Sequence, residues 1–336
     1  MKIRTNCSPG HPSLPGAVLK VLLIVNPSAS GVTARNRVVI QNAFAAAHHL
    51  DVAETNRRGH ATRLAQGATA AGVELVITLG GDGTVNEVAN GLARTDVAMG
   101  VLPGGSTNVF ARTLGLTNEP VAAANELLNS LDRGPDVLRK IGLGNVNGRF
   151  FCFHVGMGYD AAVVAEVEKR GTLKRWLGHP LFITAAVSTW ARGYDRSAPA
   201  FCVDIGGGEL PTDGLFAIVM NTDPYTYLGP RPLSLIPELT LDDPLGLVNL
   251  RGLTLSGTLR AVVAALRGGR GLERLGHVDI HTGLQSITVR GHRPFPWQVD
   301  GDHLGDTELL NFRFEPECLT LVVPSRHAHP SEQAGA

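Results

Sequence analysis

Apolar and polar positions in the first part of the chain follow the pattern of buried strands that alternate with amphipathic helices. Apolar, β-branched runs typical of parallel strands lie at Val18–Val25, Asp51–Thr55, Leu75–Leu79 and Val97–Leu102. Helical spacing of apolar residues lies at Ala34–His49, Ala61–Ala71 and Glu119–Leu131. The alternation predicts an open α/β domain over residues 17–134.

From Val137 onward the pattern changes to strands separated by turns. Strand runs lie at Val137–Leu143, Phe150–Val155, Ala200–Ile205, Phe216–Asn221, Leu233–Leu241 and Leu247–Leu253. Helical stretches lie at Ala161–Gly193 and Leu255–Arg267. We expect a β-rich, sandwich-like domain over residues 135–318 and a strand over 319–324 that returns to the first domain. Residues 1–16 are expected to be a disordered lead-in, and residues 325–336 a flexible tail.

The stretch Leu75–Gly91 joins a buried strand to a helix through a glycine turn, with the sequence LVITLGGDGTVNEVANG. Thr84 and Glu87 have the spacing of a capping box, which predicts that the helix begins there. Free N–H groups and the helix dipole favour phosphate at such a junction, and glycines allow close approach and positive φ. A carboxylate here, Asp82, would repel phosphate unless a metal or a transferable proton involves it.

Two well-known nucleotide motifs do not fit the chain. No G-x-x-x-x-G-K-[ST] occurs, and Asn86 stands where the third glycine of G-x-G-x-x-G belongs. Gly156–Ala161 fits G-x-G-x-x-A, but Arg175–Leu177 lies where a dinucleotide site needs an acidic residue. An ordinary strand–helix turn is therefore the structural alternative to a phosphate site at Gly80–Gly83.

Composition narrows the class of protein. The 336 residues are enough for two domains, and a formal net charge of zero gives no reason to expect nucleic acid as a partner. The cysteines, Cys7, Cys152, Cys202 and Cys318, are widely spaced and are expected to be reduced. No apolar run is long enough to span a membrane, and Met1–Gly16 lacks a signal-peptide core. We therefore expect a soluble, cytoplasmic protein.

The segment Gly80–Val88, GGDGTVNEV, resembles the GGDGT-x-NEV signature of the diacylglycerol kinase and sphingosine kinase family of lipid kinases. Further motifs follow in the family's order over roughly Val21–Val323. The resemblance implies an active site in the cleft between the domains, with ATP and Mg²⁺ as cofactors. It implies transfer of the γ-phosphoryl group to a lipid hydroxyl. Diacylglycerol is the first candidate acceptor, and sphingoid bases or other lipid alcohols are the alternatives.

The resemblance also implies nucleotide contacts in a first loop (Asn26–Ser30), at Thr55, in the glycine turn and in a third loop (Pro103–Arg112). The residues concerned are Asn26, Pro27, Ser28, Ala29, Ser30, Thr55, Gly80, Gly81, Asp82, Gly83, Thr84, Val85, Asn86, Ser106 and Arg112. The third loop resembles P-x-G-T-x-N-D-F-A-R, but Ser106 replaces threonine and Val109 replaces aspartate. Thr55 as a helix cap and Arg112 as a surface arginine are the structural alternatives.

The catalytic carboxylate is expected in Phe295–Asp302, which resembles the family's Q-x-D-G-E segment with Asp302 in place of glutamate. Asp302 or Asp82 would accept the proton of the acceptor hydroxyl, and Asp82 would hold Mg²⁺ with Asp300 and Asp302. A polar hairpin turn at Asp300–Asp302 is the alternative, with Asp82 alone serving metal and proton transfer.

Two further sites are implied by the resemblance. Glu166 and Glu168 follow a G-x-G-x-D-A turn that faces the lipid acceptor in the family, although such glutamates are often solvated surface residues. Thr240, Asp243 and Leu245 lie in a turn that resembles a structural magnesium site of bacterial members, with Pro244 in place of glycine. A plain Asp-Asp-Pro turn is the alternative there.

The expected partners are ATP, a lipid alcohol, the inner face of the membrane through peripheral contact and, as an option, a second copy of the chain. A docking face would combine basic and apolar residues, namely Lys169, Arg170, Lys174, Arg175, Leu181, Phe182 and Trp190. The alternative functions are a soluble-substrate kinase similar to NAD kinase and a nucleotide-sensing pseudokinase.

Overall fold

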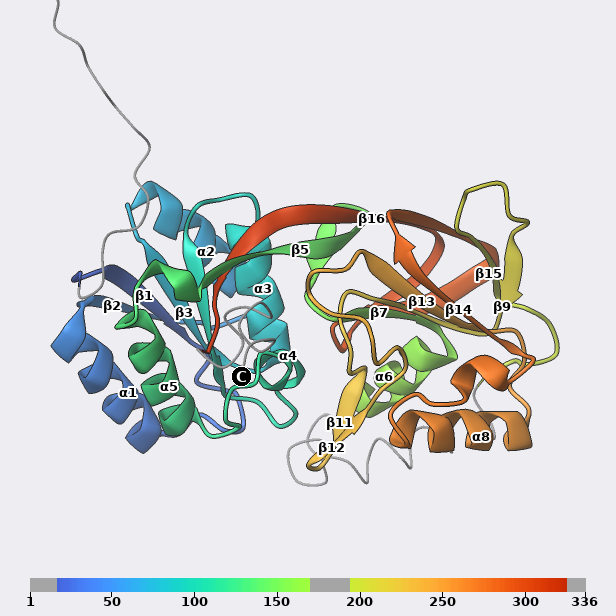
Figure 1. The fold of residues 1–336 in the computed structure, drawn as a ribbon, viewed down its shortest axis with the longest axis horizontal. Coiled ribbons are helices and arrows are strands. Elements are labelled where there is room, and N and C mark those ends of the chain that lie inside the picture. The colour runs from blue at the N-terminus through green and yellow to red at the C-terminus, as the bar shows by residue number, and fades with distance from the viewer. Residues whose placement is uncertain (1–16, 170–193, 325–336) are drawn as a thin grey trace, which may run out of the picture.

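The computed structural model describes residues 17–169 and 194–324 (Figure 1). The expected lead-in and tail lie outside these ranges. So do six of the seven residues of the expected docking face, and the side chain of the seventh, Lys169, is likewise not described. Within the described residues, no helix is long and apolar enough to cross a membrane.

The first region is the predicted open α/β unit. Its parallel strands are β1 (Lys20–Val25), β2 (His49–Glu54), β3 (Leu75–Gly80) and β4 (Ala98–Pro103). Its helices are α1 (Ala34–Ala47), α2 (His60–Ala70), α3 (Asp82–Leu92), α4 (Val109–Thr113) and α5 (Pro120–Leu131). Helices α1 and α5 cover one face of the sheet, and α2 and α3 cover the other (Figure 1). Every residue of β3 and β4 is buried, as their continuous apolar runs predict.

The second region is β-rich, as predicted. Its first elements are η1 (Pro135–Val137), β5 (Leu138–Val146), β6 (Arg149–Phe151), β7 (His154–Gly158), α6 (Tyr159–Lys169), β8 (Phe201–Asp204), β9 (Thr212–Gly214) and β10 (Phe216–Met220). The elements that follow are β11 (Thr226–Leu228), β12 (Arg231–Leu233), β13 (Leu245–Leu250), α8 (Leu255–Leu266), η3 (Leu272–Arg274), β14 (Val278–Leu284), β15 (Ser286–Val299) and β16 (Asp302–Val322).

The long strand β16 joins the two regions into one hydrogen-bonded sheet, in the order β14-β13-β10-β7-β15-β16-β4-β3-β1-β2 (Figure 1). It pairs antiparallel with β15 and β5, and Leu321 pairs in parallel with Met99 of β4. Leu310 and Phe312 are buried in the core of the second region, whereas Leu319 and Leu321 are buried in the core of the first. A continuous sheet between the regions was not expected from the sequence.

Three local expectations are wrong, and each has a physical cause. The strand predicted over Leu233–Leu241 ends at Leu233, because the following amides donate outside the sheet. The amide of residue 234 donates to Ala265 O, and those of residues 235 and 236 donate to the Asp223 side chain. The strand predicted over Phe150–Val155 is split into β6 and β7, because amides in its middle donate to Asp300.

The third concerns the start of α3, which has Gly81 as its N-cap rather than Thr84. The two residues of the supposed capping box contact other elements. Thr84 Oγ1 accepts a hydrogen bond from Asn26, and the Glu87 carboxylate accepts from the amides of Gly59 and Ala61. The side chains that were expected to begin α3 therefore attach α3 to its neighbours.

Candidate active site

Loops after β1, β3 and β4 meet at the carboxyl edge of the parallel sheet and are bonded through their backbones. Gly31 N donates to Gly104 O at 2.7 Å, and Gly104 N donates to Gly80 O at 2.8 Å. A Cβ on Gly104 would lie 2.8 Å from Gly80 N, and a Cβ on Gly105 would lie 2.8 Å from Gly81 Cα. The glycines are required for this close approach.

The glycines of the glycine turn do not use the positive φ that glycine allows. Gly80, Gly81 and Gly83 all keep φ outside the left-handed region, and Gly81 is extended, with φ −86° and ψ 178°. The turn is therefore an ordinary helix start, in which Gly80 and Gly81 provide space rather than an unusual backbone conformation.

The first loop is held against α3 by Asn26. Its Nδ2 donates to Thr84 Oγ1 at 2.9 Å, and its Oδ1 accepts from Ser28 N at 3.0 Å. Pro27, Ser28 and Ser30 are exposed beyond it, and the amide of Thr55 donates to Val25 O at the next strand end. The structure thus gathers the first-loop candidates and Thr55 at the edge that carries the glycine turn.

Asp82 lies in the first turn of α3 and holds the start of α4. Its Oδ2 accepts from Val109 N at 3.0 Å and its Oδ1 from Phe110 N at 3.1 Å. Burial raises the pKa of Asp82, and these amide hydrogen bonds oppose the rise. Val109, which stands where the resembled family has aspartate, is buried. Asp82 therefore positions the third loop.

The third loop presents its two candidates differently. Ser106 is exposed at the tip of the loop. Arg112 reaches the β11–β12 hairpin of the second region, where Nη1 donates to Gly229 O at 3.0 Å. Its guanidinium carbon lies 3.5 Å from the centre of the Tyr227 ring. Arg112 is therefore not a plain surface arginine, since its side chain links the two regions.

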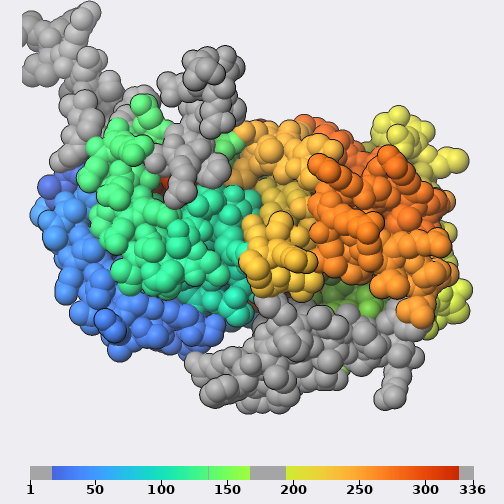
Figure 2. Space-filling model, turned by 60° about the horizontal axis from the view of Figure 1, so that its bottom comes forward, coloured from blue at the N-terminus to red at the C-terminus, as the bar shows by residue number. Residues whose placement is uncertain are grey.

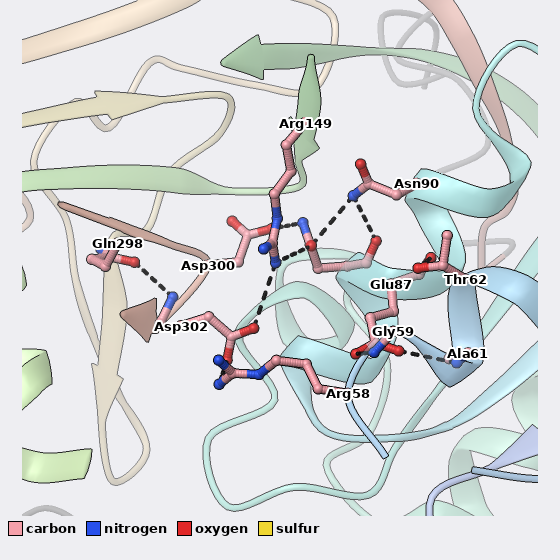
Figure 3. A network of polar contacts seen from close by, with 12 residues as sticks. Arg58, Gly59, Ala61, Thr62, Glu87, Asn90, Arg149, Gln298, Asp300 and Asp302 are labelled. Carbon is pink, nitrogen blue, oxygen red and sulfur yellow. Dashed lines mark hydrogen bonds and ion pairs between the residues drawn. The ribbon is translucent and has the colours of Figure 1, made fainter. Parts of the chain in front are cut away.

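Asp300 is the buried junction between the regions (Figure 3). It lies in the turn between β15 and β16 with φ 47°. Its carboxylate accepts from the amides of Cys152 (2.7 Å), Phe153 (3.0 Å) and His154 (3.0 Å), and from Asn86 Nδ2 (2.8 Å). Burial raises the pKa of Asp300 to about 6, and the four donors oppose the rise because each of them stabilises the ionised carboxylate.

Asn86 of α3 has its side chain fully occupied by this junction. Nδ2 also donates to Phe150 O at 2.9 Å, and Oδ1 accepts from Arg149 Nη2 at 2.9 Å. Asn90, one turn later, donates to Phe150 O at 2.9 Å and accepts from Phe150 N at 2.9 Å. A phosphate contact from the Asn86 side chain would require one of these bonds to break.

Asp302 follows the junction and lies beside the first turn of α3 (Figure 3). A Cβ on Gly83 would lie 3.5 Å from Asp302 Oδ1. Arg58 Nη2 lies 3.4 Å from Oδ1, Arg149 Nη2 lies 3.5 Å from Oδ2, and 21% of the Asp302 side chain is exposed. The structure therefore brings Asp302 to the glycine turn, with two cations beside it and a solvent-accessible carboxylate.

A second series of hydrogen bonds fixes the turn between β15 and β16 that carries Asp300 and Asp302. Tyr225 OH donates to Asp160 Oδ1 at 2.6 Å, and Gln298 Nε2 donates to Asp160 Oδ2 at 2.8 Å. Gln298 Oε1 in turn accepts from Gly301 N at 2.8 Å. The G-x-G-x-D-A turn and the Q-x-D-G-D segment thus form one network that fixes Gly301 between the two carboxylates.

The remaining candidates lie elsewhere. Glu166 is on α6 and half-buried, and the side chain of Glu168 lies outside the described residues. Asp243 Oδ2 accepts from Thr240 N (2.8 Å) and Thr240 Oγ1 (2.7 Å), and Leu245 begins β13. The carboxylate of Asp243 therefore closes its own turn, and a magnesium ion at this place stays a prediction.

Sequence reasoning missed several residues of the site, which are Arg58, Arg149, Asn90, Asp160, Tyr225 and Gln298. Asp160 lies in the G-x-G-x-D-A turn, as an acidic residue at the start of a helix, and Gln298 lies in the Q-x-D-G-D segment, as an amide residue in an apolar strand. Such polar residues in buried elements need partners, which is the signal that could have found them. Arg58 and Arg149 have no comparable signal.

Comparisons with known proteins identify the family of this chain. Residues 20–139 match the family described as the diacylglycerol kinase catalytic domain. A YegS-like candidate lipid kinase of Pseudomonas fluorescens is 30% identical over 319 residues, which cover 91% of this chain and 95% of that protein. The diacylglycerol kinase of Bacillus subtilis is 28% identical over 297 residues, which cover 84% of this chain and 89% of that protein. A crystal structure of a candidate diacylglycerol kinase from Bacillus anthracis has the same fold, with a TM-score of 0.73 at 24% identity over 96% of this chain and 99% of that one.

The packing of the loops predicts that Gly104→Ala lowers the free energy of unfolding by about 1–3 kcal/mol, as overpacking does. The added methyl group would meet the backbone of Gly80, which cannot move without displacing β3. Gly67→Ala is the matched control, because a Cβ there meets open space on α2 and should leave stability equal or higher. Chemical denaturation of both variants measures the difference, and equal stabilities would contradict the packing account.

Proposed function

Because this chain belongs to the diacylglycerol kinase catalytic-domain family of lipid kinases, we propose that it phosphorylates diacylglycerol with ATP to give phosphatidic acid. Family membership makes it a phosphotransferase that uses ATP and a lipid acceptor. Diacylglycerol is proposed because the Bacillus subtilis relative is named for that activity. The observation that carries the proposal is the position of Asp302 beside the first turn of α3.

In this proposal the phosphates of ATP lie at the N-terminus of α3. The first N–H groups of a helix have no partner within it, and the helix dipole is positive at this end. The loops after β1 and β4 flank this helix end, because both are bonded to the β3–α3 turn. Arg58 and Arg149, which flank Asp302, add positive charge where negative charge develops during phosphoryl transfer.

Asp302 is the proposed general base. Its contacts to arginine are long, at 3.4 and 3.5 Å, and its carboxylate is partly exposed, so it can accept a proton from an acceptor hydroxyl. That hydroxyl oxygen attacks the γ-phosphorus, and the bond from the γ-phosphorus to the bridging oxygen of ADP breaks. Asp82 is assigned a different role, because both of its oxygens already hold the start of α4.

Magnesium fits the site in a limited way. Within the described part of the chain no three His, Cys, Asp or Glu side chains gather as a metal centre. Mg²⁺ in kinases takes one or two carboxylates and completes its shell with phosphate oxygens and water. Asp82 is the proposed protein ligand, since its carboxylate lies in the first turn of α3, beside the proposed phosphate position. Bound there, the ion would neutralise charge on the phosphates.

A lipid panel tests the acceptor. The protein is incubated with labelled ATP and, separately, with diacylglycerol, monoacylglycerol, sphingosine and NAD, and products are separated by chromatography. We expect label in phosphatidic acid, because the Bacillus subtilis relative is named for phosphorylation of diacylglycerol. Label in a different lipid would replace diacylglycerol as acceptor, and label only in NAD would contradict the lipid proposal.

Substitution of Asp302 tests the proposed base. Asp302→Asn should lower kcat by about 10²–10⁴-fold, the usual contribution of general acid–base catalysis, while ATP affinity stays equal or increases. Affinity is not expected to fall, because the arginines beside residue 302 then face phosphate without a competing carboxylate. Asp302→Glu should keep appreciable activity, since it restores the residue of the resembled family.

The matched control is Asp306→Asn, an exposed aspartate on the same strand, which should leave kcat unchanged. Steady-state kinetics and calorimetric titration with ATP separate the two effects. A near wild-type kcat for Asp302→Asn would move proton transfer to Asp82.

A further inference from the structure

Helix α8 has its apolar side chains on the wrong face for a helix of a soluble domain. The residues it buries against the second region are small, namely Gly257, Ala264 and Ala265. The residues it exposes are large, with exposed fractions of 64% for Leu255, 62% for Leu259, 43% for Val262, 37% for Val263 and 41% for Leu266. An amphipathic helix in a soluble protein normally places such residues toward the core.

The exposed residues of α8 form a continuous stripe rather than scattered positions. Their spacing of four, three, one and three residues places them on one side of the helix. Single exposed leucines are common on protein surfaces, but a contiguous apolar stripe marks a surface that another apolar phase covers.

The charges around this stripe select the partner. Arg260, Arg267 and Arg270 are exposed at its border, and Glu273 is the only acidic residue between Thr254 and Arg274. Leu259 and Val263 line a groove of about 350 Å³ together with these three arginines. Apolar side chains surrounded by arginines fit an anionic phospholipid surface. The apolar side chains would insert at the boundary between headgroups and acyl chains, and the guanidinium groups would contact the lipid phosphates.

We propose that the exposed face of α8, with Arg260, Arg267 and Arg270, is the surface by which this protein docks on anionic membranes. The choice of a membrane rests on the proposed function, because a water-insoluble acceptor must be met at a bilayer. A second copy of the chain would also cover an apolar face, but the like charges of the three arginines would oppose such a pairing.

The position of α8 relative to the active site supports this assignment. The carbonyl of Ala265 accepts from Ser234 N at 3.1 Å, directly after the β11–β12 hairpin. The same hairpin receives Arg112 from α4, whose first amides are held by Asp82. Helix α8 and the hairpin lie along one edge of the molecule in Figure 1 and adjoin each other on the face turned forward in Figure 2. A membrane bound at α8 would therefore lie next to the hairpin that leads to the phosphate loops.

Vesicle sedimentation without ATP or acceptor tests the docking surface. The vesicles are phosphatidylcholine with or without phosphatidylglycerol, at low and high salt. We expect wild-type binding to require phosphatidylglycerol and to weaken with salt. Leu259→Gln/Val263→Gln should weaken the partition coefficient by about tenfold or more, since two buried apolar side chains are lost. Arg267→Gln/Arg270→Gln should weaken it by about fivefold per charge and reduce the salt dependence.

The matched control is Val38→Gln/Val39→Gln on α1, where valines are 51% and 43% exposed on the first region. This variant should bind vesicles as the wild type does. Denaturation curves check that each variant is folded. Equal vesicle binding by the α8 variant and the wild type would overturn the proposal, as would a dimer in size-exclusion chromatography that only the α8 variant loses.

Turnover of a short-chain diacylglycerol below its micellar concentration separates docking from catalysis. The Leu259→Gln/Val263→Gln variant should match the wild type on this monomeric acceptor and lose activity only on vesicles. If the lipid panel shows a different acceptor while vesicle binding still depends on α8, the docking surface stands and only the diacylglycerol assignment fails.

Discussion

The buried carboxylate of Asp300 is the constraint on which the rest of the site depends. A buried charge is costly unless hydrogen bonds compensate it, and here three consecutive amides and Asn86 do so. These bonds interrupt the strand between β6 and β7 and fasten the β15–β16 turn to α3. Asp302, two residues later, is thereby placed at the helix end where phosphate is expected to bind.

The family signature in Gly80–Val88 acts as a structural junction as well as a candidate phosphate site. Each of its polar side chains reaches another element: Asp82 reaches α4, Thr84 the first loop, Asn86 the second region and Glu87 the start of α2. Its glycines admit the neighbouring loops. A substitution within this segment therefore displaces surrounding elements, which explains why so many polar and glycine positions lie in one short stretch.

Local structure could be predicted from the sequence most readily where an element is buried. The buried runs of β1, β3 and β4 were recognised from apolar residues alone. Most of β16 was missed, because its first residues, 302–309, are exposed or half-buried on both faces and show no alternation. The resemblance located Asp302 in the chain, but not Arg149 beside it or the Asn86–Asp300 bond, whose partners are 214 residues apart. Pairings at such separation leave no trace in local periodicity.

The central claim is that Asn86 and Asp300 couple the two regions through a buried, charge-assisted hydrogen bond. A double-mutant cycle of Asn86→Ala and Asp300→Asn, followed by chemical denaturation, measures that coupling directly. Asparagine tolerates the positive φ at position 300, so the backbone conformation is preserved in the variant. The account predicts a coupling free energy of about 1.5–3 kcal/mol, the range for hydrogen bonds to charged groups. A coupling within about 0.5 kcal/mol of zero would mean that the residues act independently, and would contradict it.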